Sequence, residues 1–315
     1  MKKFITIMIF ILVTILLTSC NFSEEQSEGK KITFKNKKVL NDEITNYGFE
    51  LGLTDETSIN ENQVLFKIKD TSSASFTPSI KIKNNFDNAY TYRLFFLIDY
   101  MHKSVNLNDR KLNYIDVDLN KHQSKEFSVS LDMPQGISDL LVLCVRDPDN
   151  ILDEEQYVSS GNVYLARRAV IINGIDNYKK NINYSAINVY NQHSSSDNSV
   201  SSPVITLLNK EDKELKQYRI SSKFTGNLQL KMGNLNNDTN YAILSFFGNE
   251  QMNLDNKYIN VKGEGEFKID LMSLPIKKAL NKNIIISVVE NPFTLDENEL
   301  IQQKVEFVNI ISLVE

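Results

Sequence analysis

The sequence predicts an all-β protein with two tandem Ig-like β-sandwich domains that arose by internal duplication. Short segments alternate between apolar and polar residues and are separated by polar turns, which is typical of a sandwich. No stretch keeps a helical period for more than about two turns. The pattern of the first half of the chain recurs in the second half. With 315 residues, 41% of them hydrophobic, the chain is long and apolar enough for two folded cores.

The first domain is expected to span residues 30–173. Alternating segments predict half-buried strands, and nearly continuous apolar runs predict strands that are buried on both faces. The alternating segments are Phe49–Leu53, Val64–Ile68, Ile80–Lys83, Ile115–Leu119 and Phe127–Leu131. The apolar runs are Tyr92–Tyr100 and Leu140–Val145, and Val163–Ile172 closes the domain.

The second domain is expected to span residues 174–315, because the same features return in the same order. Tyr92 returns as Tyr241, about 150 residues later. The further matched segments are Ile80–Lys83 with Leu228–Lys231, Ile115 and Val117 with Ile259 and Val261, Leu140–Val145 with Ile284–Val288, and Asp147-Pro148 with Asn291-Pro292. So many matches in order indicate duplication of one domain.

The first twenty residues have the composition of a secretory signal. Lys2 and Lys3 precede an apolar run, Phe4–Leu17, which is shorter than the ~20 residues that a transmembrane helix needs. The run ends in Leu17-Thr18-Ser19-Cys20, which resembles the lipobox of bacterial lipoproteins. This resemblance implies that residues 1–19 are a cleaved signal peptide and that Cys20 Sγ carries a diacylglyceryl group. Plain secretion is the alternative.

The lipobox resemblance implies an extracytoplasmic protein held at the cell membrane or outer envelope by its lipid anchor, because two or three acyl chains give a stable hold. Residues 20–29 are polar and predict a flexible tether. The net charge of −5 becomes −7 when Lys2 and Lys3 leave with the signal. This acidity argues against nucleic acid as a partner. It leaves an envelope protein or a glycan as the expected partner.

Three carboxylates suggest a calcium site, and calcium is the one cofactor that the sequence suggests. Asp147 and Asp149 are two residues apart and Asp153 follows shortly after, and Ca²⁺ prefers six to eight oxygen ligands. The alternative is a solvated acidic loop with a structural X-Pro turn. The return of this turn as Asn291-Pro292, with fewer carboxylates nearby, favours the structural role.

A series of tyrosines suggests a ligand-binding face. Tyr178, Tyr184 and Tyr190 are spaced by six residues, which would place them on one face of a strand. Tyrosine set among asparagines suits contact with a sugar or a peptide. The alternative is packing, because Tyr184 and Tyr190 match Phe34 and Leu40 of the first domain.

The sequence gives no catalytic residue. His102, His122 and His193 lie far apart, and Cys144 lies within an apolar run as a small buried residue would. No HExxH or GxSxG pattern and no Gly-rich phosphate loop is present. We therefore expect no enzyme activity and interpret the chain as a non-catalytic binding, adhesion or structural module. The first alternative is an extracytoplasmic receptor for a peptide, glycan or small solute, and the second is an envelope hydrolase.

Two observations separate these hypotheses. A receptor is expected to bury a pocket between its two domains, whereas an adhesion or structural module exposes a binding patch instead. A hydrolase is expected to bring together titratable groups with shifted pKa values.

Overall fold

The computed structural model is almost entirely β. It describes residues 48–55, 59–61, 65–68, 75–152, 160–174, 181–189, 203–208, 212–214, 228–263, 265–271, 282–294, 304–309 and 311–313. Within these ranges the one helical element is a short 3₁₀ turn, η1, at Ser160–Asn162, and every other regular element is a strand. The all-β prediction is confirmed.

The first sandwich consists of a small outer sheet and a larger inner sheet. The outer sheet has the order β1-β5-β11, with β1 at Phe49–Thr54, β5 at Ser79–Asn84 and β11 at Ser124–Ser128. The inner sheet has the order β10-β6-β13-β14-β3-β2, and β7 pairs with β6. Its strands are β10 (Ile115–Leu119), β6 (Tyr90–Ile98), β13 (Gly136–Arg146), β14 (Tyr164–Asn173), β3 (Leu65–Lys67), β2 (Ile59–Glu61) and β7 (Met101–Lys103).

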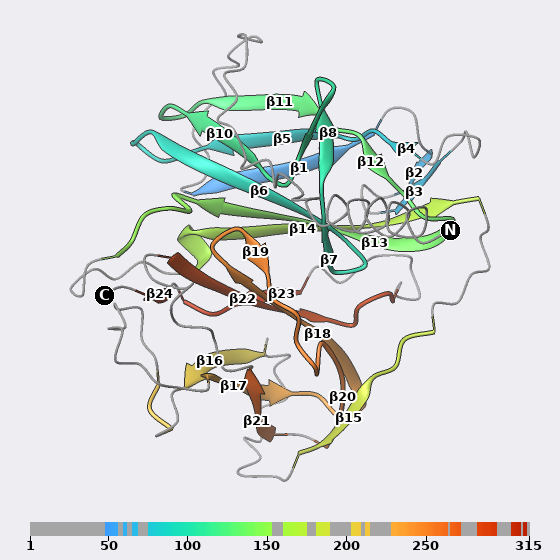
Figure 1. The fold of residues 1–315 in the computed structure, drawn as a ribbon, viewed down its shortest axis with the longest axis vertical. Coiled ribbons are helices and arrows are strands. Elements are labelled where there is room, and N and C mark those ends of the chain that lie inside the picture. Colours follow the sequence, from blue (N-terminus) through green and yellow to red (C-terminus); the bar gives the residue numbers. More distant parts are fainter. Residues whose placement is uncertain are drawn as a thin grey trace, which may run out of the picture.

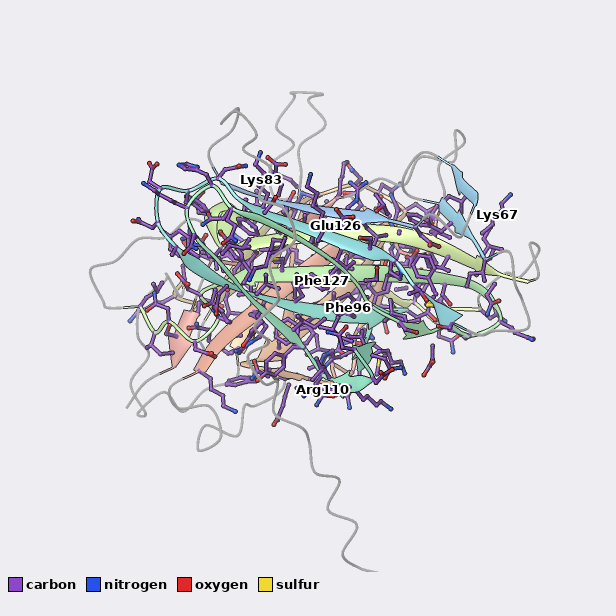
Figure 2. The ribbon with its side chains drawn as sticks, turned by 90° about the horizontal axis from the view of Figure 1, so that it is seen from above. Lys67, Lys83, Phe96, Arg110, Glu126 and Phe127 are labelled. Atoms are coloured by element: carbon purple, nitrogen blue, oxygen red, sulfur yellow. The ribbon has the colours of Figure 1, made fainter. Side chains whose placement is uncertain are left out.

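Two short pairs complete this sandwich. β4 (Ser75–Phe76) pairs with β12 (Leu131–Asp132), and β8 (Val105–Leu107) forms a hairpin with β9 (Arg110–Leu112). Phe127 of β11 and Phe96 of β6 belong to the same buried core between the two sheets. In Figure 2, which looks down on the outer sheet, Lys83 and Glu126 lie on this sheet and Arg110 lies at the periphery of the molecule.

The second sandwich also has a small and a large sheet. The small sheet has the order β16-β17-β21, with β16 at Val204–Leu208, β17 at Leu228–Leu235 and β21 at Gly265–Leu271. The large sheet has the order β15-β20-β18-β22-β23, and β19 and β24 pair with β18 and β22. Its strands are β15 (Ser185–Asn188), β20 (Tyr258–Lys262), β18 (Thr239–Phe247), β22 (Lys282–Glu290), β23 (Val305–Phe307), β19 (Glu250–Gln251) and β24 (Ile311–Leu313).

The two sandwiches have corresponding strand orders. β1-β5-β11 corresponds to β16-β17-β21, and β10-β6-β13-β14 corresponds to β20-β18-β22-β23. Tyr92 of β6 and Tyr241 of β18 are both fully buried, and they pair with Arg146 and Glu290 at the ends of β13 and β22. Descent of both halves from one duplicated domain remains a prediction, which this correspondence favours.

One of the sequence matches differs from the observed register. Tyr92 pairs with Val117, whereas Tyr241 pairs with Ile259. Strand pairing therefore makes Val117 and Ile259 the equivalent positions of the two sandwiches. The sequence match of Val117 to Val261 is displaced from this by two residues. A shift of two keeps every side chain on the same face of a strand, so the apolar pattern alone does not detect it.

The four sheets stack as layers, with the two large sheets facing each other in the middle (Figure 1). Along β6, Leu94, Phe96 and Ile98 point into the core of the first sandwich. Phe95 and Leu97 point the other way, into a third apolar cluster that also contains Phe246, Ile285 and other residues of the second half. We call this shared cluster the seam. It explains why the sequence of β6 is apolar on both faces.

Candidate functional site

The described residues place polar groups at two locations, along the seam and at one loop end of the first sandwich. At the seam, Asp99 and Tyr100 form the tight turn between β6 and β7, and both have positive φ, 54° and 63°. A tyrosine in this left-handed region is uncommon, so surrounding contacts must hold it there. Tyr100 is fully buried.

Residues of the second half form hydrogen bonds to this turn. The carbonyl oxygen of Tyr100 accepts hydrogen bonds from Gln251 Nε2 at 2.8 Å and from Lys257 Nζ at 2.6 Å. The carbonyl oxygen of Asp99 accepts one from the Tyr258 hydroxyl at 2.9 Å. Burial at this position lowers the pKa of Lys257 to about 8, against an opposing effect from Asp99.

A buried ion pair lies beside the turn. Arg168 of β14 is 0% exposed and Asp139 of β13 is 1% exposed. Asp139 Oδ2 accepts hydrogen bonds from Arg168 Nη2 at 2.8 Å, from the Tyr100 hydroxyl at 2.5 Å and from the Phe293 backbone N–H at 2.8 Å. Phe293 belongs to the second half, so one carboxylate oxygen joins the two sandwiches. A carboxylate buried in this way is stable only while its donors remain in place.

Tyr184 is the one tyrosine of the predicted ligand-binding series that lies within the described residues. It directly precedes β15, is partly exposed, and its ring meets that of Tyr258 edge-on at 6.1 Å. Its hydroxyl lies 3.5 Å from the Pro292 carbonyl oxygen, and burial together with Asp139 raises its pKa to about 12. Tyr178 and Tyr190 lie outside the described residues, so ligand binding by this series stays a prediction.

His102 also packs at the seam. Its ring meets Phe95 and Phe246 edge-on, each at 5.6 Å, and its Nε2 lies 2.7 Å from the Asn113 carbonyl oxygen. Burial lowers the pKa of His102. His122 contacts Asp87 at the surface, and His193 lies outside the described residues. Cys144 is a free, fully buried thiol, as its sequence context predicts.

At the loop end, Arg93 joins several segments. This buried side chain of β6 makes two hydrogen bonds of 2.8 Å to Asp116 and two of 2.9 Å to Asp149. Its Nη1 also donates to Asn249 Oδ1 of the second half at 2.6 Å. The guanidinium carbon lies 4.3 Å from the centre of the Tyr114 ring. Arg93 therefore links the loop after β13 to both sandwiches.

The two described carboxylates of the predicted calcium site have separate partners. Asp149 binds Arg93 through both of its oxygens. Asp147 Oδ1 accepts the Thr91 backbone N–H at 3.3 Å, and burial raises the pKa of Asp147. Asp153 and Cys20 lie outside the described residues. Within the described ranges, no three His, Cys, Asp or Glu side chains are grouped to hold a metal ion, and calcium binding stays a prediction.

The X-Pro turn of this loop recurs in the second half with the same geometry. Asp147 has φ 47° and its N–H donates to the Thr91 carbonyl at 2.7 Å. Asn291 has φ 48° and its N–H donates to the Asn240 carbonyl at 2.8 Å. Asparagine and aspartate tolerate the left-handed region better than other residues with side chains. The matched geometry supports the structural role that the sequence offered as an alternative.

Beside this turn, the Arg146 guanidinium packs against two adjacent aromatic rings. Its guanidinium carbon lies 4.5 Å from the ring centres of both Phe86 and Tyr90. The two rings meet edge-on at 5.3 Å. Arg146 Nε is buried and has no hydrogen-bond acceptor. We call Arg146, Phe86 and Tyr90 the Arg146 platform.

Sequence reasoning missed all three of these arginines. Arg93 and Arg168 each interrupt an apolar run, and Arg146 ends one. A charge inside a run that is buried on both faces must have a buried partner, which is the signal that could have identified Arg93 and Arg168. It could not have identified the partners, because Asp149 and Asn249 lie far from Arg93 in the sequence.

Comparisons with known proteins give weak structural likenesses. No protein-family model and no curated protein sequence matches the chain. The CARDB domain of a Pyrococcus furiosus protein in complex with di-metal ions is 10% identical, with a TM-score of 0.26 over 42% of this chain and 97% of that domain. The Acinetobacter baumannii CsuC–CsuE chaperone–tip adhesion subunit complex is 10% identical, with a TM-score of 0.22 over 80% of this chain and 95% of that one.

A red sea bream transglutaminase is 8% identical, with a TM-score of 0.23, and the match covers 85% of this chain but 31% of the enzyme. Likenesses of this size carry no argument about function. Among the described residues, no helix is long and apolar enough to cross a membrane.

Proposed function

We propose that this chain is a lipid-anchored envelope protein that acts as a rigid, non-catalytic binding module. The lipobox resemblance at Leu17–Cys20 supports the location. The seam supports the rigidity of the module. There Phe95, Leu141 and Leu143 of the first sandwich pack with Phe246 and Ile285 of the second. Large apolar interfaces hold domains in one orientation, whereas a receptor that closes on a ligand needs a hinge between them.

Further contacts between the two halves support the same interpretation. Asn283 Nδ2 donates to the carbonyl oxygens of Pro148 and Asn150 at 3.0 and 2.9 Å, and Tyr164 stacks on Phe307 at 5.2 Å. Side chains of the second half thus contact both the backbone and a side chain of the first half. Opening the seam would therefore expose apolar sheet faces and break several hydrogen bonds together.

Rigidity can be measured with two spin labels. Lys81 on β5 and Lys268 on β21 are exposed and belong to the two outermost sheets. Replacing both with Cys gives label sites far from the seam, while Cys144 stays buried. We expect one narrow distance distribution that does not change when envelope extract is added. A broad distribution, or one that shifts with the extract, would favour a hinged receptor.

Binding is tested by capture from envelope extract on the immobilised mature chain, with calcium and with a chelator. We expect a protein or glycan to be retained in both conditions and lost when the chain is unfolded beforehand. Retention only with calcium would instead point to Asp147, Asp149 and Asp153. Retention of nothing would contradict the binding-module proposal.

A further inference from the structure

Among the described residues, the guanidinium of the Arg146 platform has no hydrogen-bonded carboxylate. Every other arginine of the inner sheet of this sandwich either binds a carboxylate, as Arg93 and Arg168 do, or has other contacts, as Arg167 does. Arg146 makes no side-chain hydrogen bond and no ion pair within the described part of the chain. Its side chain contacts the two aromatic rings and acts electrostatically on Asp147 and Tyr92. The position is partly exposed.

The corresponding position of the second sandwich is different. Glu290 ends β22 as Arg146 ends β13, and it is 4% exposed. Lys304 Nζ lies 3.3 Å from Glu290 Oε1. The second sandwich thus neutralises the charge at this place, and the first does not. The fold itself therefore does not require an unpaired cation here.

We infer that the Arg146 platform binds the carboxylate of an acidic sugar, such as a uronic acid residue of an envelope glycan. This inference rests on the proposed function and assigns the ligand class of that binding module. A guanidinium presents a planar fork of N–H donors that matches a carboxylate, and packing against the two adjacent rings fixes its orientation.

The surrounding residues favour a sugar. Tyr90 and Phe49 are partly exposed residues, and the ring centroid of Phe49 lies 5.2 Å from that of Tyr92 in the same aromatic cluster. Partly exposed rings beside polar side chains suit the apolar face and the hydroxyl groups of a sugar. Asn88 is exposed in the adjacent turn and adds an amide.

A peptide is disfavoured because the neighbouring backbone is already paired. Sandwiches commonly bind peptides by adding a strand, which needs free N–H and C=O groups. At this end Thr91 uses its N–H and its carbonyl on Asp147, and the N–H groups of Asn84 and Asn85 donate to Gln123 and Gly48. The nearby carboxylate of Asp149 does not compete for Arg146, since Arg93 holds it through both oxygens.

The test measures binding of a galacturonic acid trimer to the mature chain by titration calorimetry. The variants are Arg146→Met, Arg146→Lys and, as matched control, Arg110→Met on the exposed β9. We expect wild type and R110M to bind alike and R146M to bind about tenfold more weakly or worse, since a charge-assisted bidentate contact is lost. R146K keeps the charge without the fork and should be intermediate.

Equal binding by R146M and R110M, or no binding by the wild type, would overturn the inference. Equally tight binding of an oligoglutamate with the same Arg146 dependence would overturn the assignment to a sugar. Melting temperatures of the variants show whether each is folded. If R146M is unfolded, the comparison is made with R146K instead. Capture from envelope extract that persists in R146M would leave the proposed function standing while removing this site from it.

Discussion

Phe95 of the first sandwich and Phe246 of the second face each other across the seam, with ring centroids 5.0 Å apart. Both side chains are buried, Phe95 at 0% and Phe246 at 1% exposure. Each lies on the central strand pair of its own large sheet, β6 with β13 and β18 with β22. The two sandwiches therefore share apolar surface that neither could bury alone.

Truncating either ring should destabilise the whole chain. We expect Phe95→Ala or Phe246→Ala to lower the free energy of unfolding by about 3–5 kcal/mol, through lost burial and a cavity. Urea unfolding should show one transition reported by both halves. Val204→Ala, at an exposed position of β16, is the control and should change stability little. Two separate transitions in the wild type would contradict a shared seam.

Asp139 and Arg168 give a second prediction at the seam. Asp139→Asn removes the charge that balances the fully buried Arg168, so we expect a loss of about 3–5 kcal/mol of unfolding free energy. The matched surface change is Glu266→Gln, which breaks a pair with Lys231 whose side chains are 49% and 35% exposed. That change should cost under about 1 kcal/mol. Equal losses in the two variants by urea unfolding would show that the buried pair has no special role.

The lipid anchor is tested by processing. Cys20→Ala removes the sulfur that the lipobox resemblance assigns to the diacylglyceryl group. We expect the variant to accumulate as an uncleaved precursor without acyl chains, measured by mass spectrometry of the membrane fraction. Ser19→Ala is the control, because alanine is also accepted at that position of a lipobox. Normal cleavage of the Cys20 variant would point to plain secretion.

The sequence predicts the long central strands of this fold well, because each of them carries its own apolar signal. Short strands such as β7 and β15 carry too little pattern to be predicted. The continuous apolar run Leu140–Val145 predicts burial on both faces, which is confirmed: Leu140, Val142 and Cys144 pack in the first core, and Leu141, Leu143 and Val145 pack in the seam. The partner of the second face could not be predicted. It is another apolar sheet, and apolar contacts carry no pairing information in a single sequence.

The polar contacts were harder to predict, since they join residues far apart in the chain. Asp149 looked like a metal ligand because carboxylates close in sequence suggest a shared cation. In the structure both of its oxygens bind Arg93, which lies on another strand. Tyr184 was singled out as part of a ligand-binding series, which stays a prediction, and its neighbours Asp139 and Tyr258 come from separate strands.

His102 should make the seam sensitive to acid. Burial lowers its pKa below the ordinary value of 6.5. The unfolded chain therefore takes up a proton first as the pH falls, and the stability that neutral His102 supports is present above about pH 6.5 and lost below it. The groups facing the ring are the Asn113 carbonyl, Phe95 and Phe246. We expect the melting temperature of wild type to fall more than that of His102→Gln between pH 7.5 and pH 5.5, and equal falls would contradict this.

Lys257 should make the folded chain more stable as the pH rises in the alkaline range. Burial lowers its pKa from 10.5 to about 8. Between these values the unfolded chain binds more protons than the folded one, so this residue favours folding increasingly as the pH rises from about 8 towards 10.5. The neutral amine can still donate to the Tyr100 carbonyl oxygen, and it avoids the cost of a buried charge. We expect wild type to gain melting temperature relative to Lys257→Met between pH 7.5 and pH 9.5. The exposed Lys81→Met variant should follow wild type, and a gain that is equal in all three proteins would remove Lys257 as its cause.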